Sequence, residues 1–161
     1  CLVLTRQHLA HGQVKVVQHF AAQGRVRINL QELQQVLINL IVNAVQAMPE
    51  GGTLTLETHD RDAHADARGV RIVVRDTGGG IRAEDMARLF DPFFTTKKRQ
   101  GTGLGLSISH TLVERYGGRI EADNAPGEGA VFTVSLLAEP DYRNDKAATE
   151  RGHESREANA T

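Results

Sequence analysis

The sequence of 161 residues has little cysteine, no excess of either charge and no long apolar run. Its single cysteine is Cys1, which excludes a disulfide framework or a cysteine metal site within the chain. A formal net charge of −1 argues against bulk nucleic-acid binding and against attraction to a membrane surface. No run approaches the roughly 20 apolar residues of a membrane-spanning helix, and no signal peptide is visible. We therefore expect a cytoplasmic protein without direct membrane contact.

The length suits one domain, but Cys1 is not a natural start, so we expect a piece of a longer protein. The parent protein is then free to carry a membrane anchor elsewhere. Residues 1–12 are expected to form a linker or the end of a helix from a preceding domain, and residues 13–138 the domain itself. Residues 139–161 are charged and small. Because they bury too little apolar surface to offset ordering entropy, we expect disorder there.

The periodicity of apolar residues predicts the order of helices and strands. Strands are predicted at 13–20, 25–28, 53–58, 70–74, 119–122 and 131–137. Helices are predicted at 30–48, 84–90 and 104–116. This order predicts an α+β fold with helices on one face of a mixed, mostly antiparallel sheet. Residues 59–69 are a predicted hairpin loop, and residues 91–103 are basic and long for a connection, which favours a functional lid.

The helix predicted at 30–48 is apolar around most of its circumference, so it should be buried. Its polar side chains fall on one narrow stripe and are Glu32, Gln35, Asn39, Asn43 and Gln46. Asn29 and Glu32 have the spacing of a capping box. Asn39 and Asn43 lie one turn apart, and two amides in a cleft offer oxygen ligands to a hard cation or donors to phosphate. A core helix with one polar seam would explain the same stripe.

Two glycine-rich segments are candidate ligand sites. Asp76 begins DTGGG (76–80), whose glycines permit close approach of the backbone to a ligand. Its carboxylate can accept a hydrogen bond from an exocyclic amine such as that of adenine, although a plain Asp-Gly turn is the alternative. Residues 101–107, GTGLGLS, open a helix whose N–H groups suit phosphates, with a glycine-rich hinge as the alternative. The segment matches neither a P-loop, nor the protein-kinase loop, nor a Rossmann site.

Residues 90–97, FDPFFTTK, combine apolar anchors with a lysine. The phenylalanines would dock the lid while Lys97 reaches a phosphate as a point charge. A small hydrophobic plug is the alternative. The histidines form no HxxxH or HExxH pair, which argues against a zinc site.

Taken in order, four blocks resemble the catalytic ATP-binding domain of sensor histidine kinases. QVLINLIVNAVQAM, DTGGGI, LFDPFFTTK and GTGLGLSI are similar to the N box, first glycine box, F box and second glycine box of that family. The family belongs to the GHKL group, shared with gyrase, a heat-shock chaperone and a mismatch-repair protein. The resemblance covers about 29–137, and FFTTK and NAVQAM look most like the nitrogen-regulation and dicarboxylate-sensing branch. It implies the Bergerat fold, a two-layer α/β sandwich.

The resemblance also implies roles for individual residues. Asn43 would coordinate Mg²⁺ at the ATP phosphates, with Asn39 as a supporting metal ligand, and Asp76 would bond the adenine amine. Asn39, Asn43 and Lys97 would be the catalytic residues. The implied nucleotide contacts are Asn43, Gln46, Asp76, Gly78, Gly80, Ile81, Phe94, Thr95, Lys97, Gly101, Thr102, Gly103, Leu104, Gly105 and Leu106.

Three departures from the family pattern stand out. Gln46 replaces a residue that is basic in many members, a charge that Lys97 could supply. Ala130 replaces Thr or Ser, which predicts the loss of a polar contact near the base. The phospho-acceptor block is absent, because neither His8 nor His11 matches it.

The implied activity is transfer of the γ-phosphate of Mg·ATP to a histidine on a separate dimerisation domain, with a response regulator as partner of the full kinase. The alternatives are a GHKL-type ATPase and a nucleotide-sensing module without transfer. The ATPases of the group carry a Glu base four residues before the metal-binding asparagine, where this chain has Asn39. Because an amide cannot act as a general base, we expect poor hydrolysis.

Overall fold

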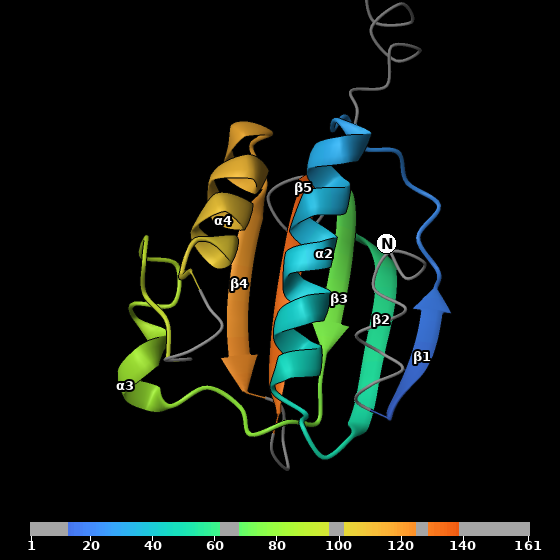
Figure 1. Ribbon diagram of the computed structural model, residues 1–161. Coiled ribbons are helices and arrows are strands. Elements are labelled where there is room, and N and C mark those ends of the chain that lie inside the picture. Colours follow the sequence, from blue (N-terminus) through green and yellow to red (C-terminus); the bar gives the residue numbers. More distant parts are fainter. Residues whose placement is uncertain (1–12, 62–67, 97–101, 125–128, 139–161) are drawn as a thin grey trace, which may run out of the picture.

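The computed structural model describes residues 13–61, 68–96, 102–124 and 129–138. The elements are β1 (Val14–Phe20), α2 (Leu30–Gln46), β2 (Gly52–Arg61), β3 (Gly69–Arg75), α3 (Ala83–Met86), α4 (Gly105–Arg115), β4 (Arg119–Asn124) and β5 (Ala130–Leu137) (Figure 1). The strands of these segments form a sheet in the order β1-β2-β3-β5-β4. β1 runs parallel to β2, and the other neighbouring pairs are antiparallel. The predicted mixed, mostly antiparallel sheet is confirmed.

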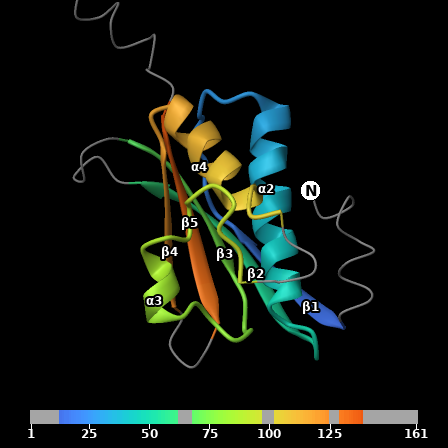
Figure 2. The ribbon, with the colours of Figure 1, turned by 60° about the vertical axis from the view of Figure 1, so that its left-hand side comes forward.

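The helices α2 and α4 lie on the same face of the sheet, as the two views of the ribbon show (Figures 1 and 2). α2 packs against β2 and β3, while α4 packs against β4 and against α2. The core between the layers includes the buried side chains of Val36, Leu40, Ile41, Leu54, Val74, Val113, Phe132 and Val134. The two-layer α/β sandwich is therefore confirmed. In the described segments, no helix is both long and apolar enough to cross a membrane.

The strand predicted at 25–28 is wrong. Only Val26 finds a strand partner there, as an isolated bridge to Ala138. The preceding backbone bonds to a side chain instead, because the N–H groups of Gln23 and Gly24 donate to the Asp60 carboxylate at 3.0 and 2.8 Å. These bonds stabilise the carboxylate anion and lower the pKa of Asp60. The chain thus leaves the sheet edge before it can add a second strand.

Other boundaries differ by smaller amounts. The helix predicted at 84–90 is only the short α3, and β2 continues into the predicted hairpin loop as far as Arg61. Most of that loop, with residues 1–12 and the tail from 139, lies outside the described residues. The predicted burial of α2 holds along its middle and C-terminal half but not at its start, where Leu30 is 68% exposed.

The predicted N-terminal cap of α2 is confirmed. Asn29 Oδ1 accepts hydrogen bonds from the N–H groups of Gln31 and Glu32 at 2.8 and 3.3 Å. The Glu32 carboxylate is engaged elsewhere: it accepts from Arg115 Nη1 at 2.7 Å and from the Tyr116 hydroxyl at 2.5 Å. The bond to Glu32 holds the hydroxyl proton and raises the pKa of Tyr116. Glu32 therefore joins the start of α2 to the end of α4, rather than completing a capping box.

Asn29→Ala should lower the free energy of unfolding by about 1 kcal/mol, because two N–H groups of the first turn lose their acceptor. Urea denaturation followed by circular dichroism measures the change. Asn29→Asp is the matched control, since aspartate caps a helix as well as asparagine does. An equal loss in both variants would contradict capping as the role of this side chain.

Candidate functional site

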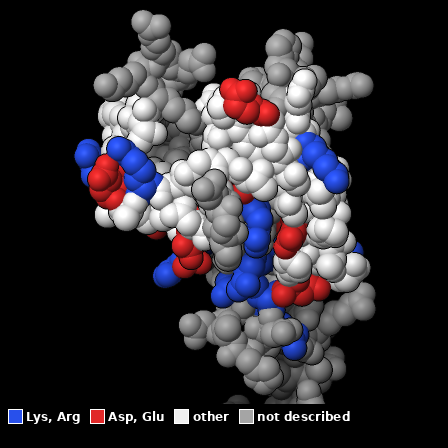
Figure 3. Space-filling view, turned by 90° about the horizontal axis from the view of Figure 1, so that it is seen from below, with Lys and Arg blue, Asp and Glu red and all other residues white. Residues whose placement is uncertain are grey.

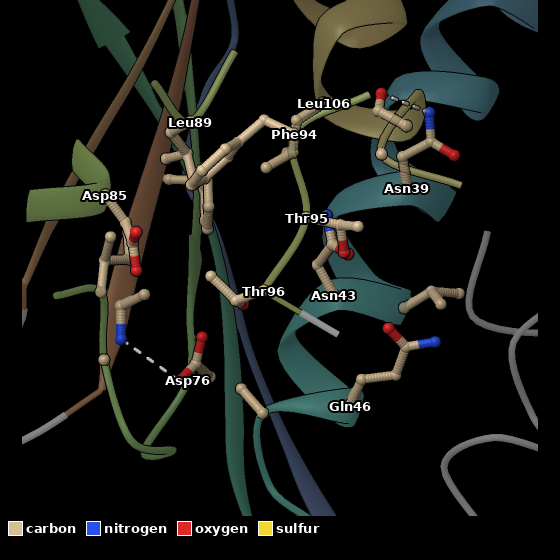
Figure 4. A pocket seen from close by; sticks show the side chains of 18 of the residues that line it. Asn39, Asn43, Gln46, Asp76, Asp85, Leu89, Phe94, Thr95, Thr96 and Leu106 are labelled. Carbon is tan, nitrogen blue, oxygen red and sulfur yellow. Dashed lines mark hydrogen bonds between the residues drawn. The ribbon is translucent and has the colours of Figure 1, made fainter. Parts of the chain in front are cut away.

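A cavity of about 450 Å³ lies between α2, the turn after β3, and the segment that leads into α4 (Figure 4). The predicted site residues that line it are Asn39, Asn43, Gln46, Asp76, Gly80, Ile81, Phe94, Thr95, Thr102, Gly103, Gly105 and Leu106. They come from all four sequence blocks, which are far apart in the chain. The fold thus brings the amide stripe of α2, the buried Asp76 and the start of α4 to one cavity.

Four predicted site residues are not among those that line the cavity. Lys97 and Gly101 lie outside the described residues. Gly78 packs instead against the end of α2, where a Cβ atom would fall 2.4 Å from the Ala47 carbonyl oxygen. Leu104 is the N-cap residue of α4. Gly78 and Leu104 therefore lie beside the cavity and shape its walls.

Asp76 is the most firmly held side chain of the site, with an exposed fraction of 2%. Its Oδ1 atom accepts hydrogen bonds from the N–H groups of Gly78 at 2.8 Å and Ala130 at 3.2 Å. The N–H group of Asp76 in turn donates to the Ala130 carbonyl at 3.0 Å. Ala130 thus contacts Asp76 through its backbone, although it has no hydroxyl. The carboxylate is fixed at the cavity wall, where it can accept a hydrogen bond from a ligand.

The close approach of β5 to Asp76 depends on Gly129. Its φ is +105°, and a Cβ atom there would fall 2.1 Å from the Asp76 carbonyl oxygen. On the other side of the turn, Asn124 at the end of β4 bonds both backbone groups of Ile81, accepting from its N–H at 2.7 Å and donating to its carbonyl at 2.8 Å. The turn after β3 is therefore held from two strands.

The polar stripe of α2 faces both the cavity and α4. Asn43 and Gln46 line the cavity, and Figure 4 shows both with Asn39 along the helix. Asn39 is already engaged within the protein. Its Nδ2 donates to the Gly105 carbonyl at 3.0 Å and to Ser109 Oγ at 3.1 Å, and its Oδ1 accepts from Gln35 Nε2 at 3.0 Å. Asn39 therefore contacts α4 while it also lines the cavity, and Asn43 and Gln46 line the cavity further along the helix.

Several residues that line the cavity were not predicted from the sequence. They are Val42, Ala47, Arg82, Asp85, Leu89, Thr96 and Phe132, while Ala130, which the sequence placed near the base, also lines the cavity. Asp85 is buried and accepts a hydrogen bond from Arg82 Nε at 2.7 Å. This bond and the charge of the carboxylate raise the pKa of Arg82. Because α3 covers only Ala83–Met86, no helical periodicity in the sequence indicates that Asp85 and Leu89 line the same wall.

The two ends of the predicted lid are joined. The N–H group of Phe93 donates to the Gly103 carbonyl at 2.9 Å, and a Cβ atom on Gly103 would fall 2.4 Å from the Phe93 carbonyl carbon. Both residues have positive φ, 66° and 68°. The prediction that the phenylalanines dock the lid holds for Phe90 and Phe94 only. Phe90 packs against the core and Phe94 lines the cavity, whereas Phe93 is 74% exposed.

The surface charges are mixed. Figure 3, which views the molecule from below Figure 1, shows Lys and Arg side chains interspersed with Asp and Glu. Among the ion pairs are Arg82 with Glu84 at 2.9 Å and Arg88 with Asp91 at 3.7 Å. The side chain of Arg88 also lies over the Phe94 ring, 4.8 Å from its centre. This contact can hold the ring at the cavity wall.

Comparison with known proteins agrees with this geometry. Residues 28–140 match the family model described as histidine kinase-, DNA gyrase B-, and HSP90-like ATPase. Sensor histidine kinase ZraS of Klebsiella oxytoca is 42% identical over 112 residues, which are 70% of this chain and 23% of that protein. Sensor kinase CckA of Brucella abortus is 42% identical over 123 residues, covering 69% of this chain and 13% of that protein. The chain thus spans less than a quarter of these relatives.

Solved structures show the same architecture. The catalytic domain of histidine kinase ThkA has a TM-score of 0.74 at 31% identity, covering 86% of this chain and 90% of that chain. Full-length ShkA in complex with AMPPNP has a TM-score of 0.70 at 27% identity, covering 86% and 29%. The fold is therefore that of a histidine kinase catalytic domain. The chain belongs to the family of histidine kinase-, DNA gyrase B- and HSP90-like ATPases.

The neighbours Gly78 and Gly79 should respond differently to alanine. Gly78→Ala should lower the free energy of unfolding by about 1–3 kcal/mol, because the new Cβ atom meets backbone that cannot move aside. Gly79→Ala should stay within about 0.5 kcal/mol, since its Cβ atom would have nothing within 4 Å. Urea denaturation of both variants measures the difference. Equal values would show that the turn does not pack against α2 as described.

Proposed function

We propose that the chain is the catalytic ATP-binding domain of a two-component sensor histidine kinase. It binds Mg·ATP in the cavity and presents the γ-phosphate to a histidine on a separate dimerisation domain. The full kinase has a response regulator as its partner. The observation that carries this proposal is the meeting, in one cavity, of a buried carboxylate, a stripe of amides and the start of a helix.

The base end of the cavity fits adenine. Asp76 is a carboxylate whose Oδ1 is held by two backbone N–H groups, so it stays aligned without a counter-ion. It can accept a hydrogen bond from the exocyclic amine. Ile81, Leu89 and Phe132 supply apolar wall around it, which matches the mixture of apolar lining and few polar groups typical of ligand sites.

The phosphate end fits Mg²⁺ and an anion. Asn43 offers an amide oxygen at the cavity, and Mg²⁺ commonly takes only one or two protein ligands beside phosphates and waters. α4 begins there without a side-chain cap, so its first N–H groups suit a phosphate. Gln46, Thr95, Thr102 and Leu106 lie around the same space. Lys97 would add a positive charge from the lid.

The protein's contribution to phosphoryl transfer is mainly positioning and stabilisation of charge. Mg²⁺, when bound, would neutralise charge on the phosphates. Asn39 cannot take a proton from water, and both of its N–H donors already bond within the protein. The position that would hold a base in a hydrolase therefore serves structure here. This arrangement favours transfer to a separate acceptor over hydrolysis.

Asn43→Ala should weaken Mg·ATP binding by about 100-fold, roughly 2.8 kcal/mol, because the metal loses its amide ligand. Isothermal titration calorimetry measures the affinity. Its unfolding midpoint in urea should stay near that of the parent chain. Gln31→Ala, on the exposed side of the same helix, is the matched control and should bind normally. Unchanged affinity in Asn43→Ala would remove Asn43 from the metal site.

Phosphotransfer in trans tests the activity itself. The chain, mixed with the dimerisation domain of its parent kinase and labelled Mg·ATP, should label a histidine on that domain. The label should be acid-labile and should disappear with Asp76→Ala, which removes the adenine acceptor. Without the dimerisation domain, phosphate release should be slow. Brisk multi-turnover release by the chain alone would favour the ATPase, and nucleotide binding without transfer would favour a sensing module.

A further inference from the structure

Two polar side chains, Ser109, which is buried, and Asn39, which is half-buried, converge on one carbonyl at the start of α4. The Gly105 carbonyl accepts from Asn39 Nδ2 at 3.0 Å and from Ser109 Oγ at 2.8 Å. The same Asn39 nitrogen donates to Ser109 Oγ at 3.1 Å. Ser109 is fully buried, and Asn39 comes from the middle of α2 (Figure 4). We call this set of contacts the α2–α4 tie.

The orientation of the Asn39 amide follows from its partners. A carbonyl oxygen can only accept, so the amide must turn its NH₂ group toward Gly105. Its two donors then serve Gly105 and Ser109, while its oxygen faces Gln35 Nε2 at 3.0 Å. All three contacts hold the amide in place between the helices. The donor side of Asn39, rather than its oxygen, is therefore the part that α4 depends on.

The start of α4 has little local support. Its N-cap residue is Leu104, whose side chain makes no capping bond. Gly103 precedes it with a positive φ of 68°. Glycine-rich backbone of this kind does not fix a helix start by itself. The tie therefore restrains the start of α4 through a residue of α2, where the N-cap residue of α4 makes no capping bond.

We propose that Asn39 and Ser109 are positioning residues that hold the first turn of α4 where its N–H groups face the phosphates, and that Asn39 is not a metal ligand. The consequence for phosphates rests on the proposed function, whereas the tie itself does not. The Ser109 hydroxyl bonds Gly105 and Asn39, and Ser109 is not among the residues that line the cavity.

Asn39→Asp separates positioning from ligation, because the two roles predict opposite effects. A carboxylate is a better Mg²⁺ ligand than an amide, so a ligand role predicts equal or tighter Mg·ATP binding. A donor role predicts the reverse: aspartate has no N–H group and would place an acceptor against the Gly105 carbonyl. Ser109→Ala removes the hydroxyl that bonds Gly105 and Asn39, and so weakens the tie without a substitution in α2. Ser107→Ala is the matched control, since Ser107 Oγ bonds only within α4, to the Leu104 carbonyl at 3.0 Å.

The experiment measures the tie first without nucleotide or metal. Hydrogen–deuterium exchange of the amides at 108–111, the first in α4 whose N–H groups bond within the helix, should be at least about tenfold faster in Asn39→Asp, Asn39→Ala and Ser109→Ala than in the parent chain, and unchanged in Ser107→Ala. Unfolding midpoints in urea confirm that each variant is folded, and Ser109→Ala carries the test if both Asn39 variants fail to fold. Unchanged exchange in the variants that lack the tie would overturn the proposal.

Calorimetry then measures the consequence. Mg·ATP should bind about tenfold more weakly to Asn39→Asp and Ser109→Ala than to the parent chain. The Mg²⁺ concentration at which half of the protein binds nucleotide, measured at saturating ATP, should stay the same. Tight binding to Asn39→Asp, together with a raised Mg²⁺ requirement in Asn39→Ala, would show that Asn39 is a ligand and overturn the proposal. If the parent chain bound no Mg·ATP, the proposed function would fail, and the exchange data would still judge the tie.

Discussion

The contact between α2 and α4 is the constraint on which the rest of the site depends. α2 presents one row of polar side chains, and two of them, Glu32 and Asn39, bond to α4 or to the residue that ends it. Glu32 bonds the end of α4, through Arg115 and Tyr116, and Asn39 bonds its start. Each such bond contributes only about 1 kcal/mol net, but together they set both ends of α4 against α2. Asn39, Asn43 and Gln46 of the same row line the cavity.

The opposite wall depends on a second close approach, between β3 and β5. The sheet places β5 beside β3, so Ala130 comes to bond Asp76 across 54 residues of chain. A buried carboxylate without such partners would be costly, and here backbone N–H groups supply them. The same bonds hold the Asp76 carboxylate at the cavity wall. In the proposed function, the contacts that keep this carboxylate stable therefore also orient it toward the ligand.

In the proposed function, these two constraints hold the carboxylate, the amide oxygen and the helix start of the cavity in fixed relation to one another. At position 39, α2 carries an amide that donates to α4. Under that proposal, a carboxylate at this position would change both the group available to activate water and the support of the start of α4.

The sequence by itself determined the fold class and the N-cap of α2, because periodicity and capping are local properties. Which blocks share one site followed from the resemblance to the family. Only the tertiary structure decided that residues 25–28 leave the sheet, that Glu32 bonds α4 rather than its own helix end, and that Asp85 joins the wall. It also decided that Asn39 bonds α4, although Asn39 and Asn43 both line the cavity. Both are amides on the same helical face, and only the neighbour that packs against each one distinguishes them.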